Sequence, residues 1–209
     1  MSLLRASERA QPIAGRAWAS RLRNPALVIE EFDRNRPRRE DALTKSVVDR
    51  LRQFRRDLRS LAGERDEWAL LDELQQHVPL VNTAAPQNFR EIAELLRAGT
   101  TLVPTELEYA RVVQRGLDKR APYSSGKNSV ADALLIELYA TQVRQCDPGD
   151  VYCFVTSNHS DFSVPVGDRR QPHPDVADLF AGDHSRYRYR VEGLDEVLTA
   201  CLGGDFLDE

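Results

Sequence analysis

The sequence predicts an α/β fold in which a small parallel sheet lies between helices. Short apolar segments alternate with longer segments of helical periodicity, a pattern typical of α/β sandwiches. Val151–Val155 is the clearest strand, and Leu27–Ile29 resembles a second short buried strand or strand end. Both are followed by polar or acidic side chains, and ligands of open α/β sheets collect beyond the carboxyl ends of strands. The pattern therefore predicts a site at that edge.

Bulk composition is that of a globular protein. The 209 residues are 41% hydrophobic and 30% charged, which suits one domain over residues 1–209. The net charge of −4 argues against capture of nucleic acid by overall charge but leaves room for local basic patches. No apolar run approaches the roughly 20 residues that span a bilayer, so we expect a cytoplasmic protein without membrane contact.

A strong amphipathic helix is predicted over residues 41–62, and residues 41–98 form a predicted helical insertion. The arginines opposite the apolar stripe either contact phosphates or form an ordinary solvated face. Further helices are predicted at 66–76, at 88–98 and at 195–202. Two more are predicted to begin after Ser129 and after Thr105, which forms a capping box with Glu108. Residues 100–104 are predicted as a loop, and residues 186–194 as an edge strand.

Residues 126–162 carry the sharpest chemical signal. Asp132 lies near the start of a predicted helix, and Asn158 and Asp161 follow the strand Val151–Val155. Oxygen ligands of this kind suit a hard cation such as Mg²⁺. The structural alternative is that Asp132 caps its helix and Asp161 forms a turn with Ser160.

Glu31 has two interpretations as well. It either points into the same site or belongs to a helix N-terminus, where carboxylates are favoured. The three cysteines lack a CxxC pair and the four histidines lack an HxxxH pair, which argues against a zinc site.

The segments VIEEFDRNR, APYSSGKNSVADALLIELY and CFVTSNHSDF, in this order, resemble PIN-like nuclease domains. The similarity is greatest to a bacterial branch whose late motif has Asn in place of Asp. The resemblance implies a helix-rich, three-layer α/β/α sandwich around a central parallel sheet. It also implies Mg²⁺ or Mn²⁺ as cofactor and hydrolysis of phosphodiester bonds, usually in RNA.

The resemblance carries roles to particular residues. Glu31, Asp132 and Asp161 match the catalytic and metal-binding acids, and Asn158 matches a further metal-site position. Expected nucleic-acid contacts are Lys127, Arg120, Thr156 and Ser157.

One feature departs from the family pattern. Such domains begin with a strand that ends in an aspartate, and Met1 falls where the helical stretch after that strand begins. We therefore expect an N-terminally incomplete domain whose neighbouring strands keep unpaired edges.

The leading functional prediction is a metal-dependent endoribonuclease. One alternative is a degenerate, non-catalytic module that binds nucleic acid or protein on the same fold. Another is a toxin-type ribonuclease controlled by an inhibitor protein, by analogy with the family. The expected partner is single-stranded or structured RNA, and a homodimer is among the open assembly states.

Overall fold

The computed structural model describes residues 2–7, 22–61, 86–123 and 129–190. The helices predicted at 66–76 and 195–202 lie outside these ranges. Among the described residues, no helix is both long enough and apolar enough to cross a membrane.

The chain divides into two compact units. One unit comprises residues 1–29 and 96–209 and contains the whole sheet. The other comprises residues 30–95 and contains most of the long helix α1 (Ala26–Leu61). In this second unit the ring of Phe32 lies 6.2 Å from that of Phe89, so α1 contacts the helical residues 86–98.

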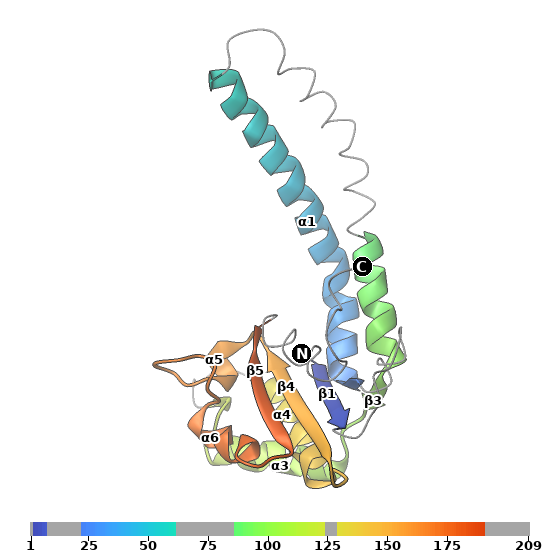
Figure 1. Cartoon of the computed structure of the whole chain (residues 1–209), viewed down its shortest axis with the longest axis vertical. Helices are drawn as coiled ribbons and strands as arrows, with labels where there is room; N and C mark the ends of the chain where they lie inside the picture. The colour runs from blue at the N-terminus through green and yellow to red at the C-terminus, as the bar shows by residue number, and fades with distance from the viewer. Residues whose placement is uncertain (1, 8–21, 62–85, 124–128, 191–209) are drawn as a thin grey trace. The chain divides into compact units, whose positions relative to one another are not determined.

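Five strands form one sheet in the order β3-β2-β1-β4-β5 (Figure 1). The pairs β2–β3 and β4–β5 are parallel, whereas β1 runs antiparallel to both of its neighbours. The sheet is thus mixed, whereas the sequence predicted a parallel sheet. The strands are β1 (Ser2–Ser7), β2 (Leu22–Pro25), β3 (Thr100–Leu102), β4 (Asp150–Thr156) and β5 (Ser185–Tyr189).

The N-terminal segment corrects one expectation. Residues 2–7 are not the start of a helical stretch but the central strand of the sheet, with Ser2 opposite Val155 and Ser7 opposite Asp150. The backbone groups of β4 and β2 that face β1 are therefore paired. A reversed strand satisfies the same ladder of hydrogen bonds that a parallel strand would.

Two further assignments were wrong. Leu27–Ile29 are helical, because the strand ends at Pro25 and α1 begins at Ala26. Proline has no N–H for a further ladder bond, and its fixed φ suits a transition into a helix. Residues 100–102 form β3 instead of a loop, since they pair in parallel with β2.

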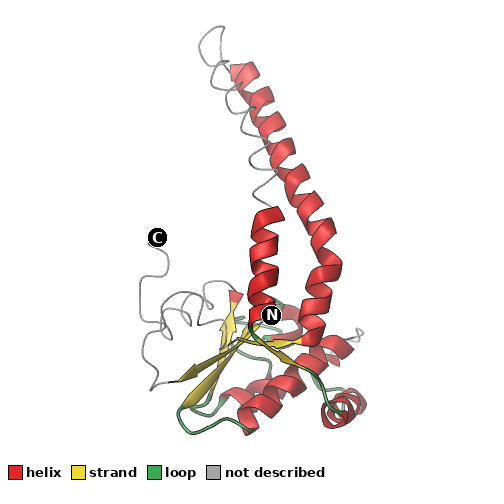
Figure 2. Cartoon of the chain, turned by 90° about the vertical axis from the view of Figure 1, so that its right-hand side faces the viewer, coloured by secondary structure: helices red, strands yellow, loops and turns green. Residues whose placement is uncertain are grey.

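Two helices of the first unit pack against each other, and the second of them packs against the sheet. α3 (Glu106–Leu117) begins with the predicted capping box, in which the Thr105 N–H donates to Glu108 Oε2 at 2.8 Å. α4 (Val130–Arg144) follows Ser129 as predicted, and its middle is buried on every side. Figures 1 and 2 show the strands of this unit as one layer with helices against it.

The main core joins α4 to β4 and β5. Ile136 and Tyr139 of α4 pack with Phe154 and Tyr187, and the rings of Tyr139 and Phe154 meet edge to face at 5.2 Å. Cys153 precedes Phe154 on β4, so its side chain points to the other face of the sheet, and it is also buried. A strand that buries both faces is expected at the centre of a layered α/β sandwich.

Candidate metal site at the end of β4

Three of the predicted site residues converge where β4 ends. Asp132 lies in the first turn of α4, while Asn158 and Asp161 follow β4 in the turn and in the short helix α5 (His159–Phe162). The Asn158 side-chain amide donates to Asp161 Oδ2 at 2.8 Å and, more weakly, to Asp132 Oδ1 at 3.4 Å. The amide thus bridges two carboxylates that are 29 residues apart in sequence.

Further hydrogen bonds fix the orientation of Asn158. Its backbone N–H donates to Thr156 Oγ1 at 3.0 Å, and its side-chain oxygen accepts from Ser160 Oγ at 2.8 Å. Thr156 is buried, so the turn is tied to the sheet itself. Side-chain groups that are held in this way form a preorganised site.

Asp161 is held by its neighbour in the chain. Phe162 is almost completely buried, and its ring meets that of Phe154 edge to face at 5.1 Å. The Phe162 carbonyl also accepts from the His173 N–H at 2.7 Å. Anchoring of Phe162 therefore directs the adjacent Asp161 toward α4 and keeps it only 9% exposed.

One carboxylate oxygen of Asp161 has no partner among the described residues. Oδ1 is buried and accepts no hydrogen bond from any described residue. A buried carboxylate oxygen without a partner is costly, so it indicates a strained group or a missing ligand. The two carboxylates supply the anionic oxygens that Mg²⁺ and Mn²⁺ prefer, and the Asn158 amide, which directs its N–H group at them here, would bind an ion through its oxygen only after turning over. These residues therefore fit a divalent cation.

The arrangement is smaller than a complete metal cage. Within the described ranges, no group of three or more His, Cys, Asp or Glu side chains is placed to hold a metal ion. The central strand β1, with the sequence SLLRAS, contributes no carboxylate. The protein ligands here would therefore be few, and water and phosphate would complete the coordination, as is usual for Mg²⁺.

The other predicted site residues are placed differently. Glu31 is exposed on α1, accepts a hydrogen bond from Asn35 at 3.5 Å and belongs to the other compact unit. Ser157 is exposed beside the site, and Lys127 lies outside the described residues. Arg120 lines a separate pocket and donates to the Asp175 carbonyl at 2.8 Å.

A buried ion pair joins α3 to α4 and was not predicted from the sequence. Arg115 donates through Nε and Nη2 to Glu137 Oε1 at 2.9 and 2.7 Å, and through Nη1 to the Ala121 carbonyl at 2.8 Å. Both side chains are more than nine-tenths buried. The sequence feature that could have predicted it is the single acid in the apolar run LLIELYA, because a buried charge requires a partner.

The structure defines a general class of protein, a layered α/β unit with oxygen-bearing side chains at the end of a strand. A family model described as the PIN domain matches residues 14–162, and the chain belongs to this family. The resemblance drawn from the sequence is thus confirmed. PIN domains are a nuclease fold family, act on nucleic acid in general and generally use divalent metals.

A curated relative carries a different name. The chain is 28% identical over 117 residues to a thioesterase, pytI, of Aspergillus terreus. The match covers 56% of this chain and 36% of that protein, so the chain spans about a third of the relative that it matches. No solved structure matches the chain.

Proposed function

We propose that the chain is a metal-dependent nuclease, an endoribonuclease that hydrolyses phosphodiester bonds in RNA. The observation that carries the proposal is the pairing of Asp132 and Asp161 across Asn158, with Asp161 Oδ1 buried and without a hydrogen bond from any described residue. Asp132, Asp161 and Asn158 would hold Mg²⁺ or Mn²⁺.

The chain's own residues have separable roles. Asp132 and Asp161 supply negative charge, and Asn158 sets the distance between them. Thr156 and Ser160 orient Asn158, while Ser157, Lys127 and Arg120 are proposed contacts to the nucleic-acid backbone. A divalent cation bound there supplies Lewis acidity toward a phosphoryl oxygen and lowers the pKa of a bound water. With few anionic ligands, we expect metal dependence in the millimolar range.

The test is cleavage of an RNA that contains single-stranded and hairpin segments, with and without Mn²⁺. We expect Mn²⁺-dependent cleavage that Asp132→Asn reduces at least a hundredfold, because one of two carboxylates is lost. Asp183→Asn is the matched control. Asp183 is an exposed residue that precedes β5, at the end of the sheet opposite Thr156, since β5 runs parallel to β4. Equal cleavage by Asp132→Asn and wild type would contradict the assignment.

A non-catalytic binding module on the same fold is the second candidate. It is favoured by the lack of a carboxylate on β1 and by the neutral Asn158 between the two acids. Such a module would bind RNA or protein equally well with and without Mn²⁺. RNA binding that is unchanged by chelator and by Asp132→Asn, together with no cleavage, would select this candidate.

A further inference from the structure

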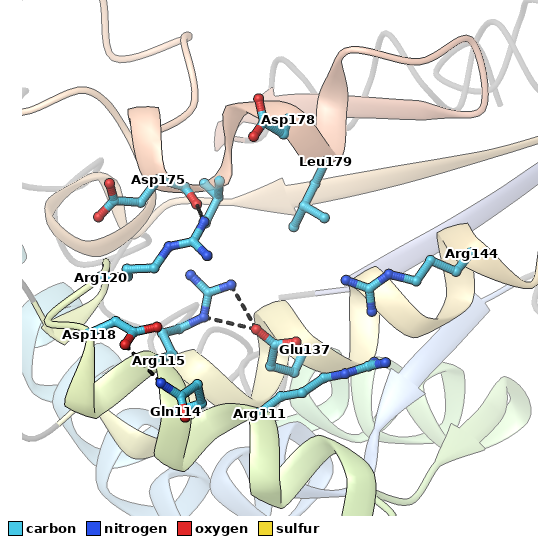
Figure 3. Close-up of a pocket in the computed structure, with 11 residues that line it drawn as sticks. Arg111, Gln114, Arg115, Asp118, Arg120, Glu137, Arg144, Asp175, Asp178 and Leu179 are labelled. Carbon is cyan, nitrogen blue, oxygen red and sulfur yellow. Dashed lines mark hydrogen bonds and ion pairs between the residues drawn. The ribbon is translucent and has the colours of Figure 1, made fainter.

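A pocket separate from the carboxylate site lies beside α3 and α4. Its volume is about 350 Å³, and its walls come from α3, α4, the loop before Tyr123, and the segment formed by α6 (Pro174–Ala177) and the 3-10 helix η3 (Asp178–Phe180). Figure 3 shows four arginines in these walls. None of the family-derived metal ligands lines this pocket.

Three of these arginines form no ion pair with a described residue. Arg111 donates to the Thr141 hydroxyl at 3.4 Å, and Arg120 donates to the backbone carbonyl of Asp175 at 2.8 Å. Arg144 is an exposed residue in the last turn of α4. Each therefore keeps its full positive charge at the pocket wall, because neither a hydroxyl nor a carbonyl neutralises a guanidinium.

The acidic residues of the pocket do not offset this charge at its centre. In Figure 3 the carboxylates of Asp175 and Asp178 are directed away from the middle of the pocket, whereas the guanidinium groups of Arg115, Arg120 and Arg144 are directed toward it. Asp175 Oδ2 accepts from the Ala121 backbone N–H at 2.6 Å, and is thus engaged by the loop.

The remaining two carboxylates are also engaged. Asp118 accepts from the Gln114 side chain at 2.8 Å, on the α3 side of the pocket. Glu137 accepts both of its hydrogen bonds from Arg115 through Oε1. The Arg115–Glu137 pair has no net charge. The guanidinium groups near the centre that form no ion pair with a described residue are thus those of Arg120 and Arg144, with Arg111 on the α3 wall.

Arg115 lines the pocket with a side chain that is held in one position. Its side chain is 8% exposed and is held by Glu137 and by the Ala121 carbonyl. A guanidinium has more N–H donors than these three bonds use, so N–H groups remain for a ligand. Because the planar group is already fixed, a ligand would bind it with little further loss of side-chain entropy.

We propose that this pocket binds a phosphate group, either of a free nucleotide or of a nucleic-acid backbone. Planar guanidinium groups match the oxygens of phosphate, and several of them around one cavity are typical of phosphate recognition. The site is distinct from the carboxylate site: Asp132 and Arg144 lie at opposite ends of α4, about 18 Å apart at 1.5 Å per residue. The proposal does not depend on metal binding or cleavage.

The test is calorimetric titration of the full chain in a chelator, with three separate probes: inorganic phosphate, a nucleoside monophosphate and a short single-stranded oligonucleotide. The variant is Arg111→Gln/Arg144→Gln, which keeps side-chain length and leaves the Arg115–Glu137 pair intact. We expect its dissociation constant for phosphate-bearing probes to rise at least tenfold. Arg169→Gln is the matched control, because Arg169 is an exposed loop arginine outside the pocket, and it should bind as wild type does.

The probes distinguish the two sources of phosphate. Weakened binding of the oligonucleotide, with a shallower salt dependence, would assign the pocket to a nucleic-acid backbone. Weakened binding of phosphate and mononucleotide alone would assign it to a free nucleotide. Equal binding of every probe by wild type and the double variant, or no binding of any probe by wild type, would overturn the proposal. Thermal unfolding of the variants checks that the fold is unchanged.

Discussion

Polar side chains in the middle of α4 and in its first turn have different surroundings. Near its middle, Glu137 is fully paired with Arg115, and Thr141 donates to Glu108 of α3 at 2.6 Å. In the first turn, Asp132 faces a second carboxylate across a neutral amide, and Asp161 Oδ1 has no partner among the described residues. Polar side chains in the middle of α4 are thus paired with α3, whereas the first turn lies beside a buried Asp161 oxygen that accepts no hydrogen bond from a described residue.

This difference distinguishes polar groups that stabilise the fold from polar groups that are available to a ligand. Paired charges in a core specify how α3 and α4 dock but offer little to a ligand. Unbalanced acids at a strand end cost stability and persist where a ligand offsets the cost. Changes at the α3 side should therefore alter stability, and changes at the first turn should alter metal binding.

The largest effect is expected when the ion pair is broken. Glu137→Ala leaves the Arg115 guanidinium buried without its carboxylate, and we expect a loss of about 3–5 kcal/mol in the free energy of unfolding. Chemical denaturation measures it. The double variant Arg115→Met/Glu137→Leu should recover most of the loss, because no buried charge remains; a double variant as unstable as Glu137→Ala would contradict this account.

A smaller effect is expected at Glu108. Burial alone raises its pKa, but hydrogen bonds from the Thr105 and Thr141 hydroxyls and the Thr105 N–H outweigh burial and hold the pKa at about 2 instead of 4.5. A carboxyl whose pKa is lowered in the folded state stabilises the fold above the unfolded pKa. This contribution, about 3 kcal/mol at pH 7, is lost as the pH falls from 4.5 toward 2.

Glu108→Gln tests this window. The variant should be less stable than wild type at pH 7, and the difference should shrink as the pH approaches 2. Unfolding free energies of the two proteins, measured by denaturant titration across this pH range, give the difference directly. A difference that stays constant with pH would show that Glu108 acts through packing rather than through its charge.

The smallest effect on stability is expected at Asn158. Asn158→Asp replaces a bridging amide with a third carboxylate, so like charges repel and the metal-free fold should lose about 1 kcal/mol. The same change should strengthen Mn²⁺ binding about tenfold, since an anionic oxygen is added. Calorimetric titration with Mn²⁺ and metal-free denaturation report the two effects, and weaker Mn²⁺ binding would place the ion elsewhere.

Local sequence chemistry predicted the elements around β4 well. The apolar run Val151–Val155, the polar turn at Asn158 and the helix that follows Ser129 are all present, because each depends on residues close in sequence. The approach of Asp132 to Asp161 followed from the rule that ligands gather at the carboxyl ends of strands.

Long-range pairing was harder to predict. Ser2–Ser7 carries no clear strand signal of its own, and its place between β2 and β4 depends on partners about 20 and 150 residues away. The partner of Glu137 could not be predicted for the same reason. In the sequence Arg115 does not differ from other basic residues, and only the packing of α3 on α4 brings it to Glu137.

The most direct test of the metal site is Mn²⁺ binding by the full chain, followed by electron paramagnetic resonance. The account predicts millimolar-range binding to wild type and to Asp183→Asn, and a loss of at least tenfold in Asp161→Asn, whose neutral amide cannot supply an anionic ligand. Equal Mn²⁺ binding by Asp161→Asn and wild type would contradict the claim that Asp132, Asn158 and Asp161 form a metal site.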